Sequence, residues 1–191
     1  MKVQWQYIID DCKRRGPQAQ EKIYRYFYPS MIKLCFRYTK GNKDEAGAIY
    51  NQAMLKVFQN IHQYQGTGEP GAWIRKIVVN CCIDHCRSNI RVATEELSDT
   101  TDILQVIPDT YNRISANEVL DLIHELPSHT GLVFNLFVIE GYKHDEIGKL
   151  LGISAGTSKW HLNEARRLLK LKLETLVQKE YVSNGIRTAT Y

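Results

Sequence analysis

The chain has 191 residues, of which 43% are hydrophobic and 24% charged, values typical of a globular protein with one or two small domains. Its formal net charge is only +4, so where the charges lie matters more than their sum. Five cysteines without a paired CxxC spacing argue against a disulfide framework and favour a reducing compartment. The N-terminal residues lack an apolar signal core and no run is long enough to span a membrane, so we expect a cytoplasmic protein without membrane insertion.

The first 42 residues carry apolar side chains at helical spacings. Arg15-Gly16-Pro17 interrupts the pattern, and Pro17 suits a first helical turn. Pro29-Ser30 is predicted to open another helix, which Gly41-Asn42 is predicted to end.

A long helix is predicted over residues 44–61. Asp44 and Glu45 suit the positive N-terminal end of its dipole. Its expected apolar face comprises Ile49, Ala53, Leu55, Val57, Phe58 and Ile61, with Tyr50, Met54 and Lys56 among them.

Residues 65–71 are rich in glycine and contain Pro70, a composition that predicts a flexible loop. A helix is predicted over residues 73–87, with a core stripe of Ile74, Ile77, Val78 and Cys81. Another face of this helix carries Lys76, Asn80 and Arg87, bordered by Trp73 and Asp84. No stretch of useful length alternates with period two, so we predict a helical bundle over residues 1–91.

Residues 92–112 contain no lysine or arginine, and they predict a flexible acidic linker over residues 92–114. Its carboxylates are Glu95, Glu96, Asp99, Asp102 and Asp109.

Helical periodicity returns from about Ser115. A first apolar pattern precedes a stop at Pro127, and a second one ends at Gly141. The two patterns are Val119, Leu122, Ile123 and Leu126, and then Val133, Phe134, Leu136 and Phe137. We assign residues 115–177 to a second domain and residues 178–191 to a polar tail that we expect to be frayed.

Residues 144–176 predict a helix-turn-helix, in which two helices are joined by a tight turn. Ile147, Leu150 and Leu151 form the apolar stripe of the first helix. Gly152 can take the positive φ that ends this helix, and Ser154 suits the N-cap of the second.

The second helix has opposite apolar and polar faces at about 100° per residue. Its apolar face comprises Leu162, Ala165, Leu169, Leu173 and Leu176. Its polar face comprises Lys159, Asn163, Arg166, Arg167 and Lys170. Such a cationic face is typical of DNA contact, and the alternative is an ordinary solvated face.

With both halves laid out, the chain resembles an extracytoplasmic-function (ECF) sigma factor of bacterial RNA polymerase over most of its length. The N-terminal motifs that carry the resemblance are Cys35-Phe36-Arg37-Tyr38, Leu55-Lys56-Val57-Phe58 and Trp73-Ile74-Arg75-Lys76-Ile77, with Asn80, Asp84 and Arg87. The C-terminal motifs are Leu126-Pro127, Glu146-Ile147-Gly148, Leu151-Gly152-Ile153-Ser154, Gly156-Thr157-Ser158-Lys159 and Ala165-Arg166-Arg167. The resemblance implies two all-α domains joined by a linker, with core RNA polymerase and promoter DNA as partners. An anti-sigma factor is a further candidate partner.

The resemblance also implies residue roles. The first domain would bind polymerase and read the melted −10 element, with candidate contacts Gln65, Gly66, Thr67, Trp73, Lys76, Asn80 and Arg87. For Trp73, a lid on the core is at least as good an interpretation as a stacking platform for a base. The second domain would read the −35 element as duplex, with candidate contacts Thr157, Ser158, Lys159, His161, Asn163, Arg166 and Arg167. Trp160 departs from the small residue typical of the family, which favours packing over reading.

The helix over residues 44–61 resembles the family's main polymerase-binding helix. Its candidate contacts are Asp44, Glu45, Asn51, Gln52 and Lys56. Acidic residues typical of the family are absent at Ala48 and at Asn51-Gln52. The linker is expected either to thread the basic channel of polymerase or to act as an inert tether.

Two other functions compete with this interpretation. A helix-turn-helix repressor or response-regulator output domain would bind duplex DNA without core polymerase. A metal or redox site could use Cys81, Cys82, His85 and Cys86, although structural zinc usually takes its ligands from two separated pairs. We expect buried free thiols, no metal, no cofactor and no enzymatic activity, because no phosphate-binding glycine loop, nucleophile elbow or HExxH motif is present.

Overall fold

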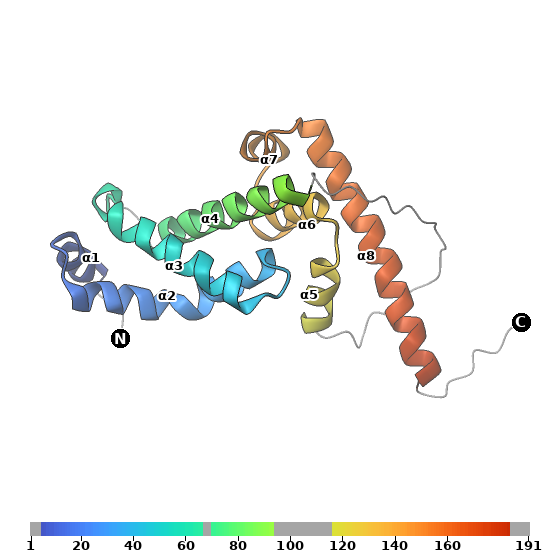
Figure 1. Cartoon of the computed structure of the whole chain (residues 1–191), viewed down its shortest axis with the longest axis horizontal. Helices are drawn as coiled ribbons and strands as arrows, with labels where there is room; N and C mark the ends of the chain where they lie inside the picture. The colour runs from blue at the N-terminus through green and yellow to red at the C-terminus, as the bar shows by residue number, and fades with distance from the viewer. Residues whose placement is uncertain (1–4, 67–69, 94–115, 184–191) are drawn as a thin grey trace, which may run out of the picture. The chain divides into compact units, whose positions relative to one another are not determined.

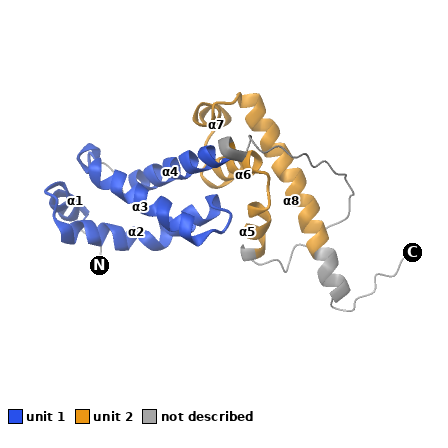
Figure 2. Ribbon diagram, in the orientation of Figure 1, with its two compact units in different colours: residues 1–89 blue, residues 90–191 orange. Residues whose placement is uncertain are grey.

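The structure is a computed structural model that describes residues 5–66, 70–93 and 116–183 (Figure 1). Every element in those ranges is helical, which confirms the all-α class. The chain divides into two compact units, unit 1 with residues 1–89 and unit 2 with residues 90–191 (Figure 2). Among the described helices, none combines the length and the apolar character that crossing a membrane requires.

Unit 1 is a helical bundle. Its described elements are α1 (Trp5–Lys13), α2 (Pro17–Tyr38), α3 (Lys43–Gln59), the 3₁₀ turn η1 (Ile61–Gln63) and α4 (Pro70–Ala93). α2 and α3 pack along each other, and α1 contacts both α2 and η1. α4 completes the core with Val78 and Cys82, whose thiol lies 3.9 Å from that of Cys35 in α2.

The helix predicted to open at Pro29-Ser30 does not begin there, because α2 runs unbroken from Pro17 to Tyr38 with Pro29 inside it. A proline inside a helix removes one backbone hydrogen bond and usually kinks or ends the helix. In α2 the buried side chains Phe27, Met31 and Leu34 flank Pro29 and continue one stripe. Tertiary packing therefore overrides the local break signal.

The turn from α2 to α3 follows the predicted signals. Lys40 and Gly41 both take positive φ, at 50° and 84°, which stops α2. The side chain of Asn42 then caps α3, because its Oδ1 accepts from the backbone N–H groups of Asp44 and Glu45 at 3.0 and 3.2 Å.

Unit 2 is organised around one long helix. Its described elements are α5 (Ala116–His124), α6 (Ser128–Phe134), the π-helical turn η2 (Asn135–Ile139), α7 (His144–Leu151) and α8 (Ala155–Ser183). α5, α6 and α7 all pack against α8. One buried cluster joins Ile123, Leu126 and Ala165, with Phe134 and Leu169 packed against it. Gly141 ends the segment before α7 with a φ of 78°, as expected.

Two predicted boundaries differ from the structure. α4 continues to Ala93, two residues into the predicted linker, and residues 94–115 lie outside the described ranges. α8 continues to Ser183, so residues 178–183, which we expected to fray in a polar tail, are helical. The remainder of that tail, residues 184–191, also lies outside the described residues.

Candidate nucleic-acid interface

The turn between α7 and α8 is held by two glycines. Gly152 has a φ of 70° and donates its backbone N–H to the carbonyl oxygen of Gly148 at 2.9 Å, and Ile153 donates to the same oxygen at 3.1 Å. A Cβ at Gly148 would lie 2.8 Å from the carbonyl oxygen of Ile153. The turn therefore needs glycine at Gly152 for its left-handed backbone and at Gly148 for its close approach. This confirms the predicted helix-turn-helix geometry.

The first turn of α8 is fixed by two hydroxyls. Ser154 is the predicted N-cap, since its Oγ accepts from the backbone N–H of Thr157 at 2.9 Å. Ser158 is fully buried, and its Oγ lies 2.9 Å from Nδ1 of His144, whose ring stacks on Phe137. Ser158 therefore holds α7 against α8, and its burial disfavours the predicted contact of its hydroxyl with DNA.

The outer face of α8 is cationic over its described side chains. Leu162 and Ala165 are buried against α6 and the rest of unit 2. Four polar members of the predicted face are exposed, namely Lys159, Asn163, Arg166 and Lys170. Trp160 is 60% exposed on this side, so the expectation that it packs is wrong.

Arg167 differs from its neighbour Arg166. Its Nε and Nη2 donate to the two carboxylate oxygens of Glu164 at 2.8 and 2.7 Å. This hydrogen bonding, with the opposite charge, lowers the pKa of Glu164 and raises that of Arg167. The ion pair cancels the charge of Arg167 locally, whereas Arg166 is exposed to solvent on the same face.

His161 faces α6 as well as solvent. Its Nδ1 lies 3.1 Å from Oγ1 of Thr130, and its ring stacks on His129 at a centroid distance of 5.7 Å. Burial, and then the charge of His129, lower the pKa of His161. The ring is therefore a neutral link between α6 and α8 near pH 7.

The predicted polar face of α4 is present in unit 1. Lys76, Asn80 and Arg87 are exposed, while Ile74 and Val78 of the same helix are buried. Spacings of four and seven residues place the three polar side chains on one side of a helix. Ile77, predicted for the core stripe, is only half-buried. Along about three turns, this side of α4 therefore presents the cation of Lys76, the amide of Asn80 and the cation of Arg87.

The loop ahead of α4 is shorter than the predicted residues 65–71, because α4 begins at Pro70. Gln65 and Gly66 are exposed, Gly66 with a φ of 72°, and Thr67 lies outside the described residues. Trp73 is half-buried, with its ring 5.6 Å from that of the buried Tyr64. Trp73 thus covers the core, which favours the lid over the stacking platform.

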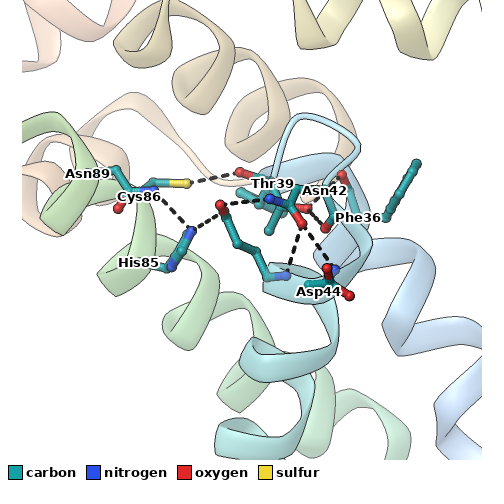
Figure 3. Close-up of polar contacts among 9 residues, drawn as sticks. Phe36, Thr39, Asn42, Asp44, His85, Cys86 and Asn89 are labelled. Atoms are coloured by element: carbon teal, nitrogen blue, oxygen red, sulfur yellow. Dashed lines mark hydrogen bonds and ion pairs between the residues drawn. The ribbon is translucent and has the colours of Figure 1, made fainter. Parts of the chain in front are cut away.

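Figure 3 shows how α3 and α4 are tied together near the end of α2. Oε2 of Glu45 lies 2.9 Å from Nε2 of His85, which also lies 3.1 Å from Nδ2 of Asn89. Nδ2 of Asn42 donates to the other carboxylate oxygen of Glu45 at 2.9 Å. Glu45, expected as a polymerase contact, therefore links α3 to α4 within unit 1, and both of its carboxylate oxygens are hydrogen-bonded. Lys56 likewise forms an ion pair with Asp84 at 3.5 Å.

The outer face of α3 holds the other candidate contacts. Asp44, Asn51 and Gln52 are exposed, and Asn51 accepts a 2.8 Å hydrogen bond from the hydroxyl of Tyr24. Leu55, predicted for the core, is 56% exposed on this face. The helical spacing could have shown this, since Leu55 falls seven residues after Ala48 and four after Asn51. The face is therefore mixed polar and apolar rather than acidic.

The cysteines near the end of α4 point in different directions. Cys82 faces Cys35, whereas Cys86 donates to the backbone carbonyl oxygen of Tyr38 at 3.4 Å. Burial raises the pKa of Cys86 to about 11, so it is a neutral thiol. Within the part of the chain that the structure describes, no group of three or more His, Cys, Asp or Glu side chains could hold a metal ion.

Comparison with known proteins identifies both units. The family model for sigma-70 region 2 matches residues 23–92, and that for sigma-70 region 4 matches residues 116–169; together they cover more than half of the chain. The chain belongs to the ECF sigma factors of bacterial RNA polymerase.

This sigma factor has distant relatives among characterised ECF members. It is 27% identical to the ECF sigma factor SigW of Bacillus subtilis, over 88% of this chain and 96% of SigW. It is 26% identical to SigE of Mycolicibacterium smegmatis, over 78% of this chain but only 60% of SigE. The fold is similar to that of the sigma factor RpoE of Bartonella quintana, solved in complex with the anti-sigma factor NepR. The TM-score is 0.50 at 15% sequence identity, and the match covers 81% of this chain and 96% of RpoE.

The polar faces of this sigma factor fall inside the matched regions. The face of α4 lies within residues 23–92, and the exposed cations Lys159 and Arg166 of α8 lie within residues 116–169. Each matched region therefore presents one exposed polar helix face.

Proposed function

We propose that this sigma factor directs core RNA polymerase to promoters, with unit 2 binding the −35 element as duplex and unit 1 binding the melted −10 element. The observation that carries the proposal is the pair of exposed faces, a cationic one on α8 and a polar one on α4. The two faces differ in charge and hydrogen-bonding groups, as recognition of duplex and of melted DNA requires. Duplex is held by phosphate contacts and groove edges, whereas a melted strand also needs hydrogen-bonding groups for unpaired base edges.

In unit 2 the first turns of α8 enter the major groove. Lys159 and Arg166 contact phosphates or guanine edges, and Asn163 hydrogen-bonds a base edge. The N-terminal backbone of α8 adds attraction for a phosphate. Arg167 contributes only when its pairing with Glu164 is released, and Thr157 and the exposed edge of His161 lie at the border of the contact.

In unit 1 the amide of Asn80 reads an unpaired base, because it offers both a donor and an acceptor. Lys76 and Arg87 hold phosphates of the melted strand on either side of it. The flipped-out base is bordered by the loop residues Gln65, Gly66 and Thr67, with Trp73 beneath.

Core polymerase binds the outer face of α3, where Asp44, Asn51 and Gln52 are exposed around Leu55. Glu45 and Lys56 act indirectly by holding α4 in place. The exposed Leu55 supplies apolar contact area on a face that has few acidic side chains to pair with a basic polymerase surface.

Further features of the proposal follow from the family. The factor works in the cytoplasm, where polymerase and DNA meet, and catalysis belongs to polymerase. An anti-sigma factor controls its access to polymerase, by analogy with the NepR complex of the Bartonella quintana protein.

Run-off transcription with purified core polymerase and genomic promoter fragments tests the proposal. We expect defined start sites only when the factor is added to core enzyme. Lys159→Ala with Arg166→Ala should abolish them, whereas Lys22→Ala, which removes an exposed cation from α2, should not. Leu55→Asp should reduce the affinity for core enzyme without changing duplex binding by the assembled holoenzyme. Specific duplex binding without any effect of core polymerase would instead indicate a repressor.

A further inference from the structure

Trp160 is a large apolar side chain on the outside of the helix that we propose reads duplex DNA. It is 60% exposed, and at about 100° per residue it lies roughly opposite the buried Leu162 and Ala165. One turn away on the same side lie the exposed Thr157 and Asn163 and the half-buried Glu164, which is paired with Arg167, and Lys159 is exposed beside it in sequence. An isolated exposed apolar residue needs no explanation. The indole of Trp160 differs from such a residue because neighbouring rings hold it in place and polar side chains surround it.

The indole of Trp160 is held by a chain of ring contacts. The ring of His161 meets it edge to face, with centroids 4.9 Å apart and planes at 72°. His161 is itself fixed to α6, because its Nδ1 lies 3.1 Å from Oγ1 of Thr130 and its ring stacks on His129. The indole is thus supported from one side while its surface stays in solvent, which lowers the entropy lost on binding.

The turn that precedes Trp160 lacks one side chain. Side chains on a helix lie over the turn N-terminal to them, and Gly156 occupies that turn four residues earlier. A Cβ at Gly156 would make only an ordinary contact, 3.5 Å from Oγ of Ser154. The fold does not require glycine at this position, although glycine destabilises a helix relative to alanine. A missing side chain here leaves room for an external surface to approach both the backbone and the indole.

We propose that Trp160 is a specificity residue that packs its indole against thymine 5-methyl groups in the major groove of the −35 element. The inference rests on the proposed function of unit 2. The thymine methyl is the apolar group that base edges present in the major groove. The flanking Lys159 and Asn163 suit a phosphate and a base edge, so the surroundings of the indole fit DNA better than an apolar protein surface. Trp160 thereby adds selection for thymine to a face that otherwise provides charge and hydrogen bonds.

Deoxyuridine substitution tests this contact, because it removes only the methyl group. We would use holoenzyme assembled from the full chain and core polymerase, and duplex fragments of a promoter found by run-off transcription. Each thymine of the −35 element is replaced singly by deoxyuridine, and dissociation constants are measured for wild type, Trp160→Ala and Trp160→Phe. Val138→Ala removes an exposed apolar side chain elsewhere in unit 2 and is the matched control.

We expect one or two positions at which deoxyuridine weakens wild-type binding about fourfold, the affinity equivalent of one buried methyl group. The same substitution should have no effect on Trp160→Ala and a reduced effect on Trp160→Phe. Val138→Ala should respond as wild type does. The salt dependence of binding should be unchanged in Trp160→Ala, since no phosphate contact is lost.

Three results would overturn the inference while leaving the proposed function intact. One is the same deoxyuridine penalty in wild type and Trp160→Ala, and another is no penalty at any position. The third is a loss of core polymerase affinity in Trp160→Ala with unchanged DNA binding, which would assign the indole to a protein partner. Failure of the wild-type holoenzyme to bind any promoter would instead contradict the proposed function itself.

Discussion

Replacing Arg166 with alanine should weaken duplex promoter binding more than replacing Arg167, although the two arginines are neighbours in α8. The structure supplies the reason. Arg166 is exposed, whereas both donor groups of Arg167 that face Glu164 are occupied at 2.8 and 2.7 Å. Glu164→Gln should therefore release Arg167 and remove a negative charge from the DNA-facing side, so that promoter binding becomes tighter.

The magnitude follows from counterion release. Each phosphate contact contributes about 0.9 to the slope of log K against log salt concentration. Arg166→Ala should lower the slope by about 0.9, so that between 50 and 200 mM salt the wild type loses about threefold more affinity than the variant. Arg167→Ala should change the slope little in the wild-type background. In the Glu164→Gln background it should lower the slope by about 0.9, because Arg167 is then available to a phosphate.

The assay is a salt titration of holoenzyme binding to a duplex −35 fragment, with fluorescence anisotropy as the readout. Lys22→Ala changes the net charge equally and should leave the slope unchanged, since it removes a cation from α2 rather than from α8. Equal slope losses for Arg166→Ala and Arg167→Ala in the wild-type background would refute the inhibitory role of Glu164. No slope loss for either variant would refute the assignment of the α8 face.

Three other predictions concern single side chains. Asn80→Ala should slow open-complex formation, measured by permanganate reactivity, while closed-complex affinity stays within about twofold, because the amide is proposed to contact only an unpaired base edge; equal losses in both would remove its role. Ser158→Ala should destabilise the fold by about 1 kcal/mol in thermal unfolding, because it leaves Nδ1 of His144 without its partner; weaker DNA binding at unchanged stability would show that Ser158 does contact DNA. Burial lowers the pKa of folded His161 below its ordinary value of 6.5, so stability should be unaffected by this group above pH 6.5 and should fall as the pH drops from there through the folded pKa. His161→Asn, which can keep the hydrogen bond to Thr130, should show a smaller fall, and an identical pH profile for both proteins would contradict the assignment.

The helix-turn-helix could be predicted because its signals are local. Gly152 and Ser154 act on backbone groups only a few residues away, so their roles do not depend on the rest of the chain. The exposed face of α4 was also predictable, since the spacing of Lys76, Asn80 and Arg87 against the apolar stripe follows from the helical period. In these cases the physical cause lies within one short stretch of sequence.

The two errors in the fold have different causes. Pro29 was predicted to begin a helix, but the buried neighbours Phe27 and Met31 keep α2 continuous. Leu55 was assigned to the core because it is apolar, without regard to its angular position on α3. The second of these errors could have been avoided from the sequence, whereas the first required knowledge of what packs on either side of the proline.

The sequence by itself determined the all-α class, the helix-turn-helix and the two polar helix faces, because helical periodicity and end signals act over one or two turns. Only the tertiary structure decided which of the candidate contact residues remain available. Ser158 is occupied by His144 and Glu45 by His85, partners that lie 14 and 40 residues away in the chain. Trp160 stays exposed because it lies opposite the buried Leu162 and Ala165, and the ring beside it is anchored to α6. A polar side chain that bonds within the fold is no longer available to a partner. Its bonding neighbour is set by the packing of distant helices rather than by local sequence.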